Sequence, residues 1–152
     1  MDVVLYDIPA WGVGELYFRD GRLLYHELPR TGERPDEKRE HSLADRIRAY
    51  FRGERTAFDD VEIEAEWATP FQAAIADALR GVPWGEVVTY GELAALAGRP
   101  RAPRAAGTFC AGNNFPLVVP CHRVVSSHGL GGYGSLGSDY KRRLLALEGV
   151  EL

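Results

Sequence analysis

Strand patterns and helix patterns are segregated along this chain, and their order limits its fold more than any other feature. Apolar and polar residues alternate over Asp2–Ile8, Gly12–Arg19 and Arg22–Leu28, as they do in half-buried strands. The dipeptide Asp20-Gly21 separates the second and third runs, and Asp-Gly between alternating runs favours a β-hairpin. Helical patterns dominate the rest. This order predicts an α+β fold, with a small N-terminal α/β lobe followed by a mostly helical C-terminal domain.

The first lobe is expected to hold one helix beside its strands. Pro29–Glu40 carries eight charged residues and no apolar face, so it is expected to be a loop. Ser42 can then cap a helix that runs to about Phe51, because the apolar residues between them recur at helical spacing. Gly53 ends this helix. The acidic run Phe58–Trp67 resembles a linker that contains a strand.

A helix start marks the beginning of the second domain. Thr69 followed by Pro70 is a favourable start, and an apolar stripe continues until Gly81 and Pro83 stop the helix. We therefore expect a lobe and linker over residues 1–66 and a C-terminal domain over residues 67–152.

Two short helices are predicted next. The first starts at Thr89 or Tyr90 and is broken by Gly98-Arg99-Pro100, and the second runs from near Pro103 to Gly112. The residues of the first helix that are expected to face inward are Leu93, Ala94, Leu96 and Ala97. The pair fits a helix-turn-helix, although any two short helices joined by a Gly-Pro turn would give this pattern.

The second of these helices has an unusually small surface. Residues 105 to 107 are Ala, Ala and Gly, and Arg104 is the one long side chain at its N-terminal end. A helix that reads the major groove of DNA presents long polar side chains, which this one lacks. Small residues would permit close approach to the narrow minor groove, with Arg104 entering the duplex. The alternative is that they pack against a neighbouring helix.

Charge and composition restrict the setting. The chain carries a formal net charge of -4, but residues 1–66 hold 10 basic and 16 acidic residues, whereas residues 67–152 hold 8 and 6. The basic residues of the second half form two clusters, Arg99, Arg101, Arg104 and Lys141, Arg142, Arg143. Such clusters are either a phosphate-binding face or an ordinary solvated surface. No apolar run is long enough to span a membrane, and no signal sequence is recognisable, so we expect an intracellular protein.

Cys121 and His122 form the candidate reactive pair. A thiol becomes a good nucleophile when a base such as imidazole removes its proton, but cysteine is also often buried as a small hydrophobe. Neighbouring residues of a flat strand face opposite ways, so adjacency alone does not make a catalytic pair. Pro120 is placed to bend the chain. The other cysteine, Cys110, is expected to be a packed small residue without a catalytic role.

Six separate segments together resemble one family, the O6-alkylguanine-DNA alkyltransferases, also called methylated-DNA-protein-cysteine methyltransferases. The resemblance covers Thr69 to Gly149, and its most diagnostic element is Pro-Cys-His-Arg-Val. The segments are Thr69-Pro-Phe-Gln, Pro83-Trp-Gly-Glu-Val-Val-Thr-Tyr, Arg104-Ala-Ala-Gly, Gly112-Asn-Asn, Pro120-Cys-His-Arg-Val-Val and Leu144-Leu-Ala-Leu-Glu-Gly. The resemblance implies a winged helix-turn-helix in a DNA-binding and alkyl-acceptor domain over residues 67–152, after a variable N-terminal domain.

The resemblance also implies catalytic roles. Cys121 matches the acceptor that attacks the alkyl carbon on guanine O6 and keeps the group as a thioether. His122 matches the base that takes the thiol proton through a bridging water, and Glu148 matches the carboxylate that orients it. Asn113 corresponds to the asparagine that ties the helix-turn-helix to the cysteine segment. Tyr90 matches the tyrosine that helps to rotate the nucleotide out of the stack and faces guanine in the pocket.

DNA and pocket contacts are implied at further positions. Arg104 matches the arginine that fills the vacated place in the stack, and Ala105 and Gly107 lie on the same DNA-binding helix. The pocket positions implied by the resemblance are Tyr90, Val124, Tyr133 and Ser135. In the loop from 126 to 138, Tyr133 is shifted by one residue from the family pattern, which leaves the roles of Tyr133 and Ser135 open.

The expected function is direct reversal of DNA alkylation in a single turnover. The expected partner is double-stranded DNA containing O6-alkylguanine, bound by a monomer in the cytoplasm at the nucleoid, or in the nucleus of a eukaryote, without a membrane. How well O4-alkylthymine competes stays open. No cofactor is expected, and no metal, because the first lobe lacks cysteine and His26 and His41 alone cannot close a zinc site.

Two other functions compete with this one. An alkyltransferase-like protein binds the alkylated base without chemistry, but such proteins lack the acceptor cysteine, and Cys121 is present. A cysteine hydrolase acting on small molecules would show sustained turnover, and it would leave the helix that bears Arg104 without a purpose.

Overall fold

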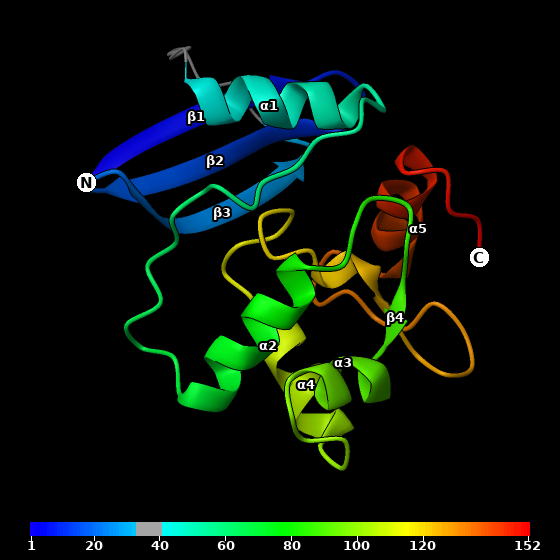
Figure 1. Cartoon of the computed structure of the whole chain (residues 1–152). Helices are drawn as coiled ribbons and strands as arrows, with labels where there is room; N and C mark the ends of the chain where they lie inside the picture. Colours follow the sequence, from blue (N-terminus) through cyan, green and yellow to red (C-terminus); the bar gives the residue numbers. More distant parts are fainter. Residues whose placement is uncertain (33–40) are drawn as a thin grey trace. The chain divides into compact units, whose positions relative to one another are not determined.

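The computed structural model describes residues 1–32 and 41–152, and the chain folds as α+β, as predicted (Figure 1). Its residue contacts divide it into two compact units. The first unit comprises Met1–Glu64 together with Asn114–Pro116, and the second comprises Ala65–Asn113 and Leu117–Leu152. The polar loop predicted over residues 29–40 lies mostly outside the described residues.

The first unit is built on a three-stranded antiparallel sheet. Its strands β1 (Asp2–Ile8), β2 (Gly12–Arg19) and β3 (Arg22–Arg30) follow one another in sequence order. Buried residues alternate with more exposed ones along β1 and β2, so one face of the sheet carries the core. Asp20 and Gly21 have positive φ angles of 52° and 78°, the left-handed conformation that a tight hairpin requires. The hairpin prediction is confirmed, and β3 extends two residues beyond the predicted end.

Helix α1 (Ser42–Phe51) covers one face of this sheet (Figure 1). Its buried side chains include Ile47, Tyr50 and Phe51. The predicted cap was wrong by one residue, because the Nδ1 atom of His41 accepts the hydrogen bond from the Leu43 N–H at 3.1 Å. The strand expected within the acidic run is a single isolated bridge between Leu23 and Ile63.

A segment from later in the chain completes the first unit beside β3. The backbone N–H of His26 donates to the carbonyl of Asn114 at 2.9 Å. The His26 ring lies between two further partners, the Pro116 carbonyl at 2.7 Å from Nδ1 and the Tyr6 hydroxyl at 2.5 Å from Nε2. A carbonyl can only accept, so Nδ1 carries the proton and Nε2 accepts from Tyr6. The buried imidazole therefore joins two parts of the sequence that are far apart.

The second unit begins with helices whose starts follow from their sequence. In α2 (Pro70–Arg80) and α3 (Tyr90–Leu96), a threonine hydroxyl accepts from the N3 backbone while the N3 side chain accepts from the threonine N–H, which is a capping box. The inward face predicted for α3 is only partly right. Leu93 and Ala94 are buried, but Leu96 is 62% exposed, because it lies on the last turn, past the contact with the rest of the unit.

Two short strands and a 3₁₀ turn connect the remaining helices of the second unit. Strand β4 (Val88–Thr89) pairs in parallel with β5 (Val124–Val125), immediately before α3 and immediately after a 3₁₀ turn over Cys121–Arg123. Helix α4 (Pro103–Ala111) packs against α3, and α5 (Ser138–Leu147) closes the unit. Within the described part of the chain, no helix has the length and apolar character needed to cross a membrane.

Candidate active site

Cys121 lies at the start of the 3₁₀ turn, where the backbone bends after Pro120. The approach to this bend contains Leu117 with a φ of 70°, a conformation that costs about 1–3 kcal/mol and persists only where the surrounding structure imposes it. Because residues 121–123 form a 3₁₀ turn and not a flat strand, the side chains of Cys121 and His122 are freed from the strict alternation of a strand.

The thiol of Cys121 opens into a small cavity of about 160 Å³ within the second unit. Helix α4 supplies one wall through Gly107 and Cys110, and Tyr90, at the start of α3, supplies another. Tyr133, from the loop before α5, lines it as well. The structure therefore brings four of the predicted site residues into one cavity: Cys121, Tyr90, Gly107 and Tyr133.

Asn113 connects α4 to the reactive segment. Its Nδ2 atom lies 3.1 Å from the Sγ of Cys121 and 2.8 Å from the carbonyl oxygen of Val119. An amide NH₂ has two hydrogens, so it donates to both atoms at once. The position of the sulfur is thereby fixed relative to the end of α4.

Burial keeps Cys121 in its thiol form. Desolvation raises the pKa of Cys121, and the hydrogen bond from Asn113, the nearby Tyr133 hydroxyl and the positive charge of Lys141 offset only part of that rise. Burial likewise raises the pKa of Cys110, and of Tyr90. A thiol with a raised pKa is a poor nucleophile at neutral pH unless a base removes its proton.

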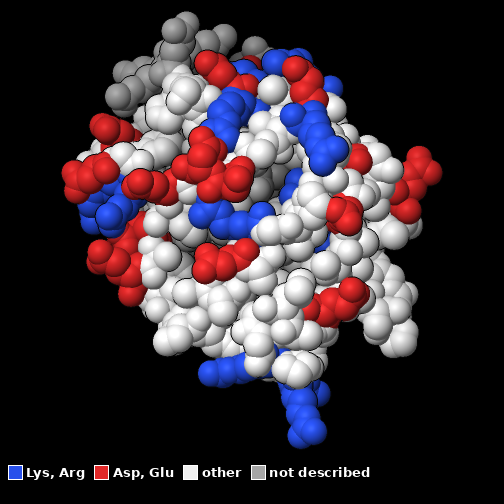
Figure 2. Space-filling model, in the orientation of Figure 1, with Lys and Arg blue, Asp and Glu red and all other residues white. Residues whose placement is uncertain are grey.

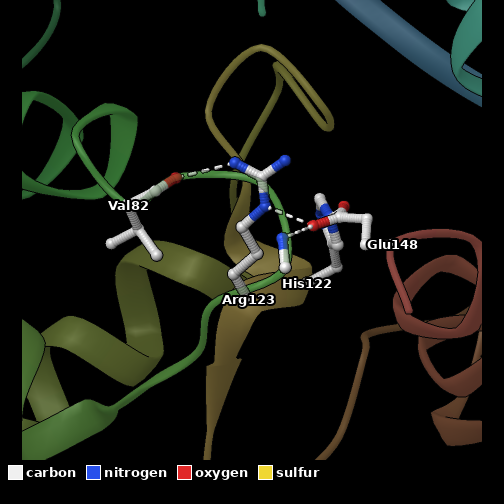
Figure 3. Close-up of polar contacts among 5 residues, drawn as sticks. Val82, His122, Arg123 and Glu148 are labelled. Atoms are coloured by element: carbon white, nitrogen blue, oxygen red, sulfur yellow. Dashed lines mark hydrogen bonds and ion pairs between the residues drawn. The ribbon is translucent and has the colours of Figure 1, made fainter. Parts of the chain in front are cut away.

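His122 is held in one tautomer by Glu148. The Nε2 atom of His122 lies 2.6 Å from Oε2 of Glu148, and both side chains are fully buried (Figure 3). A carboxylate can only accept, so Nε2 carries the ring proton and the basic lone pair is on Nδ1. Burial lowers the pKa of His122, against the opposing effect of Glu148, so the imidazole is neutral at pH 7 and able to accept a proton.

Glu148 is itself held by Arg123 and by the backbone. The Nε atom of Arg123 lies 2.8 Å from Oε1 of Glu148, and the N–H of Gly85 donates to the same oxygen at 3.1 Å. In Figure 3 the guanidinium lies between Glu148 and the Val82 carbonyl, to which it donates at 2.7 Å. Burial alone would raise the pKa of Glu148, but its contacts with His122 and Arg123 outweigh burial and lower that pKa to about 2.

Two residues of this centre were not among the predicted site residues. Arg123 lies inside the Pro-Cys-His-Arg-Val motif, directly after the candidate base His122. That position could have indicated a role for Arg123 in the site. Lys141 was taken as part of a basic surface cluster, which was wrong, because it is fully buried and its Nζ donates to the carbonyls of Val124 and Gly132 at 2.5 and 3.2 Å. Lys141 and the buried Leu144 lie three residues apart on one face of α5, and Glu148 follows at the end of the helix, which was the missed signal.

The remaining predicted pocket residues lie elsewhere. Val124 is buried and pairs with Val88 in the two-stranded ladder, and Ser135 is exposed. Neither lines the Cys121 cavity, so their pocket roles stay predictions.

The surface of α4 divides into a packed part and an open part. Ala106 is fully buried, as expected of a small residue at a helix contact, whereas Arg104 and Ala105 are exposed. Arg99 and Arg101, on the turn between α3 and α4, are exposed too. Figure 2 shows basic side chains projecting over this turn. The first basic cluster is therefore a solvent-facing surface next to the N-terminal end of α4.

Groups that could hold a metal ion were also sought. Within residues 1–32 and 41–152, no three His, Cys, Asp or Glu side chains are gathered in a suitable group.

Comparison with known proteins gives consistent results. Residues 70–150, just over half of the chain, match the family described as 6-O-methylguanine DNA methyltransferase, DNA binding domain. A methylated-DNA--protein-cysteine methyltransferase of Methanopyrus kandleri is 41% identical over 125 residues, which are 81% of this chain and 92% of that protein. One of Metallosphaera sedula is 47% identical over 100 residues, 66% of this chain and 62% of that protein.

The fold has solved counterparts. A crystal structure of Mycobacterium tuberculosis OGT in complex with DNA superposes with a TM-score of 0.81 at 35% identity, over 97% of this chain and 92% of the other.

Proposed function

Because the chain belongs to the methylated-DNA-protein-cysteine methyltransferase family, we propose that it repairs DNA by moving the alkyl group of O6-alkylguanine onto Cys121. The observation that carries this assignment is a thiol held by Asn113 at a cavity, directly followed in sequence by a buried histidine paired with a carboxylate. Glu148 fixes the tautomer of His122, and Asn113 fixes the position of the Cys121 Sγ, which opens into a cavity.

The reaction is a displacement at the alkyl carbon. His122 takes the thiol proton at Nδ1 through a bridging water, the sulfur forms a bond to the alkyl carbon, and the bond between that carbon and guanine O6 breaks. The electron pair of the broken bond stays with guanine, which takes up one proton from solvent to give the ordinary base, and His122 releases the thiol proton to solvent. We assign Tyr90, which lines the cavity, the role of donating a hydrogen bond to the departing base.

The product makes the protein a reagent that is used once. A thioether carries no charge and no good leaving group, so its cleavage would need a second activated nucleophile. One alkyl group per molecule is therefore the expected limit.

DNA binding is assigned to the surface of α3 and α4. We take these helices as the helix-turn-helix, with the loop before α5 as its wing, and α4 as the helix that enters the minor groove. Ala105 and Gly107 permit close approach, and Arg104 fills the place of the extruded nucleotide. Extrusion costs a few kcal/mol, which the inserted arginine and the cavity offset. We expect a monomer to act on duplex DNA; its cytoplasmic, nucleoid-associated location stays a prediction.

Mass spectrometry of the intact protein tests this assignment. After incubation with duplex DNA containing O6-methylguanine, the wild-type protein should gain one methyl group, and peptide analysis should place it on Cys121. Cys121→Ser should gain none while it still binds the duplex. The matched control is Cys110→Ser, which removes the other thiol of the cavity and should still be methylated.

The alternative is a protein that binds the alkylated base without chemistry. An unmodified Cys121 peptide together with intact DNA binding would establish it. Repeated turnover of an ester or peptide would instead establish a hydrolase.

A further inference from the structure

Helix α4 has a second cavity, on the face opposite the Cys121 cavity. Its volume is about 430 Å³, within the range of cavities that hold small ligands. On α4 it is lined by Ala105, Thr108, Phe109 and Gly112, whereas the Cys121 cavity uses residues 107, 110 and 111. At 100° per residue these two sets point in opposite directions from the helix axis. The same DNA-binding helix thus separates two cavities.

The lining of the second cavity is aromatic and basic. Trp67, Phe71 and Phe109 supply three aromatic side chains, and half of the Trp67 surface is exposed to solvent. The guanidinium carbon of Arg99 lies 4.5 Å from the centre of the Phe71 ring. None of the ten lining residues is acidic. A planar ligand that carries negative charge is the chemistry that complements such walls.

The surroundings favour a nucleotide over other planar anions. Arg99 and Arg101 are exposed on the turn before α4, next to Arg104 and Ala105 at the start of the helix. A guanidinium that rests its face on an aromatic ring still directs its N–H groups outward in the plane, where a phosphate can accept them. Aromatic side chains within a basic surface are the combination with which proteins hold unpaired nucleic-acid bases.

We propose that this second cavity binds an unpaired base of single-stranded DNA, which stacks on Trp67 while Arg99 contacts the adjoining phosphate. Bases inside a duplex are stacked on their neighbours and cannot enter. The site would hold the protein at gaps and overhangs. This proposal rests on the part of the proposed function that makes DNA the partner, and it does not require alkyl transfer to Cys121.

Fluorescence of Trp67 tests the proposal directly. The chain has three tryptophans, so the variant Trp11→Phe/Trp84→Phe leaves Trp67 as the only one. The oligonucleotide (dT)12 should quench its fluorescence in a saturable way, and a fully paired 12-base-pair duplex should not. No quenching by (dT)12, or equal quenching by both, would overturn the proposal.

Affinity measurements give a second readout. Trp67→Ala should weaken binding of (dT)12 by about 5-fold to 150-fold, the usual cost of removing one stacking platform, and Trp67→Phe should restore most of it. Arg99→Ala should reduce the slope of log affinity against log salt by about 0.7, the value for one phosphate contact on a single strand. Equal losses for (dT)12 and for duplex would contradict a site specific for unpaired bases.

The experiments separate this proposal from the function assigned to Cys121. Methylation of Trp67→Ala by free O6-methylguanine should proceed at the wild-type rate, because Trp67 does not line the Cys121 cavity. Loss of methylation in the wild-type protein would refute the alkyl transfer and leave the binding of (dT)12 as it was measured.

Discussion

Glu148 accepts hydrogen bonds from His122, Arg123 and the Gly85 backbone, so a single carboxylate joins the proposed base to the frame of the site. Replacing Glu148 by Gln keeps the shape and removes the charge. We expect transfer from free O6-methylguanine to slow by about 100-fold, the lower end of general-base contributions. We also expect a loss of about 3–5 kcal/mol in the free energy of unfolding, because the buried charge of Arg123 loses its partner.

The matched control for this change is Glu151→Gln, because Glu151 is an exposed carboxylate that follows Glu148 after the end of α5. Single-turnover rates and urea unfolding would be measured on both variants. A rate for Glu148→Gln within about twofold of the wild-type rate would show that the carboxylate does not support the base.

The pH dependence of transfer distinguishes a base-assisted thiol from a preformed thiolate. Burial raises the pKa of Cys121 and lowers the pKa of His122. With His122 as the base, the wild-type rate with free O6-methylguanine should stay level from pH 9 down to 7 and should fall only below the ordinary histidine pKa of about 6.5. In His122→Gln the rate should instead rise about tenfold per pH unit from 7 to 9, because it follows the thiolate fraction. A level profile in the variant would exclude His122 as the base.

Among single residues, the sequence was informative where a motif defines chemistry. The segment Pro120–Val125 predicted the candidate pair Cys121 and His122, and the family resemblance implied Glu148 as the carboxylate, which the structure places 2.6 Å from Nε2 of His122. It could not predict that Arg123 turns inward to Glu148, because an arginine is ordinarily exposed and its burial depends on the carbonyl of Val82, 41 residues away.

Among the helices and strands, α4 contains one position, Gly107, at which a substitution should change both the stability of the protein and access to the Cys121 cavity. A Cβ atom at Gly107 would lie 3.8 Å from the Tyr90 ring, an ordinary contact, so alanine fits the folded protein. Gly107→Ala should therefore increase stability by about 0.5–1 kcal/mol, because glycine inside a helix costs that much. Gly107 also lines the Cys121 cavity, and the added methyl group narrows it. Repair of duplex DNA should fall while the melting temperature rises.

Gly112→Ala is the matched control for this prediction, since Gly112 caps α4 away from the Cys121 cavity. Its added Cβ would lie 3.7 Å from the Thr108 carbonyl, also an ordinary contact. Duplex repair by Gly112→Ala should match the wild type. Unchanged repair by Gly107→Ala would show that the flush surface of α4 is not needed for access.

Helix starts were predicted best where the local sequence determines them. The threonines at 69 and 89 each form a capping box with the residue three positions later, which involves only neighbouring residues. The start of α1 was missed because His41 and Ser42 can both cap, and His41 is also stacked on Phe18 with ring centres 4.6 Å apart. That contact comes from a strand far away in sequence. Local patterns therefore predicted helices and strands better than the contacts between them.

At the scale of the whole molecule, the return of Asn114–Pro116 to the first unit is the feature that no local pattern indicated. These residues directly follow Asn113, which holds the Cys121 sulfur. They are hydrogen-bonded to His26, whose role in the sequence analysis was limited to an insufficient zinc ligand. The segment's three residues, Asn-Phe-Pro, form no strand or helix pattern of their own, so its place depends on partners that the sequence does not identify.

Burial of His26 makes the stability of the chain sensitive to acid. Desolvation lowers the pKa of His26 to about 4, although its bond to the Pro116 carbonyl opposes that change. The unfolded chain binds a proton below about pH 6.5 and the folded chain does not until about pH 4, so the stabilisation is complete above 6.5 and is lost as the pH falls between these values. Between pH 7 and 5 this histidine should cost about 2 kcal/mol of the free energy of unfolding.

Replacement of His26 by Gln isolates this contribution, because an amide can donate to Pro116 but does not titrate. Urea unfolding at pH 7 and pH 5 should show an acid-induced loss that is about 2 kcal/mol smaller in His26→Gln than in the wild type. His128→Gln should retain the full loss, since solvent surrounds His128 in the folded and unfolded chain alike. Acid sensitivity that is the same in His26→Gln and wild type would mean that the buried imidazole does not control it. The loss would then fall to His122, whose lowered pKa acts in the same direction.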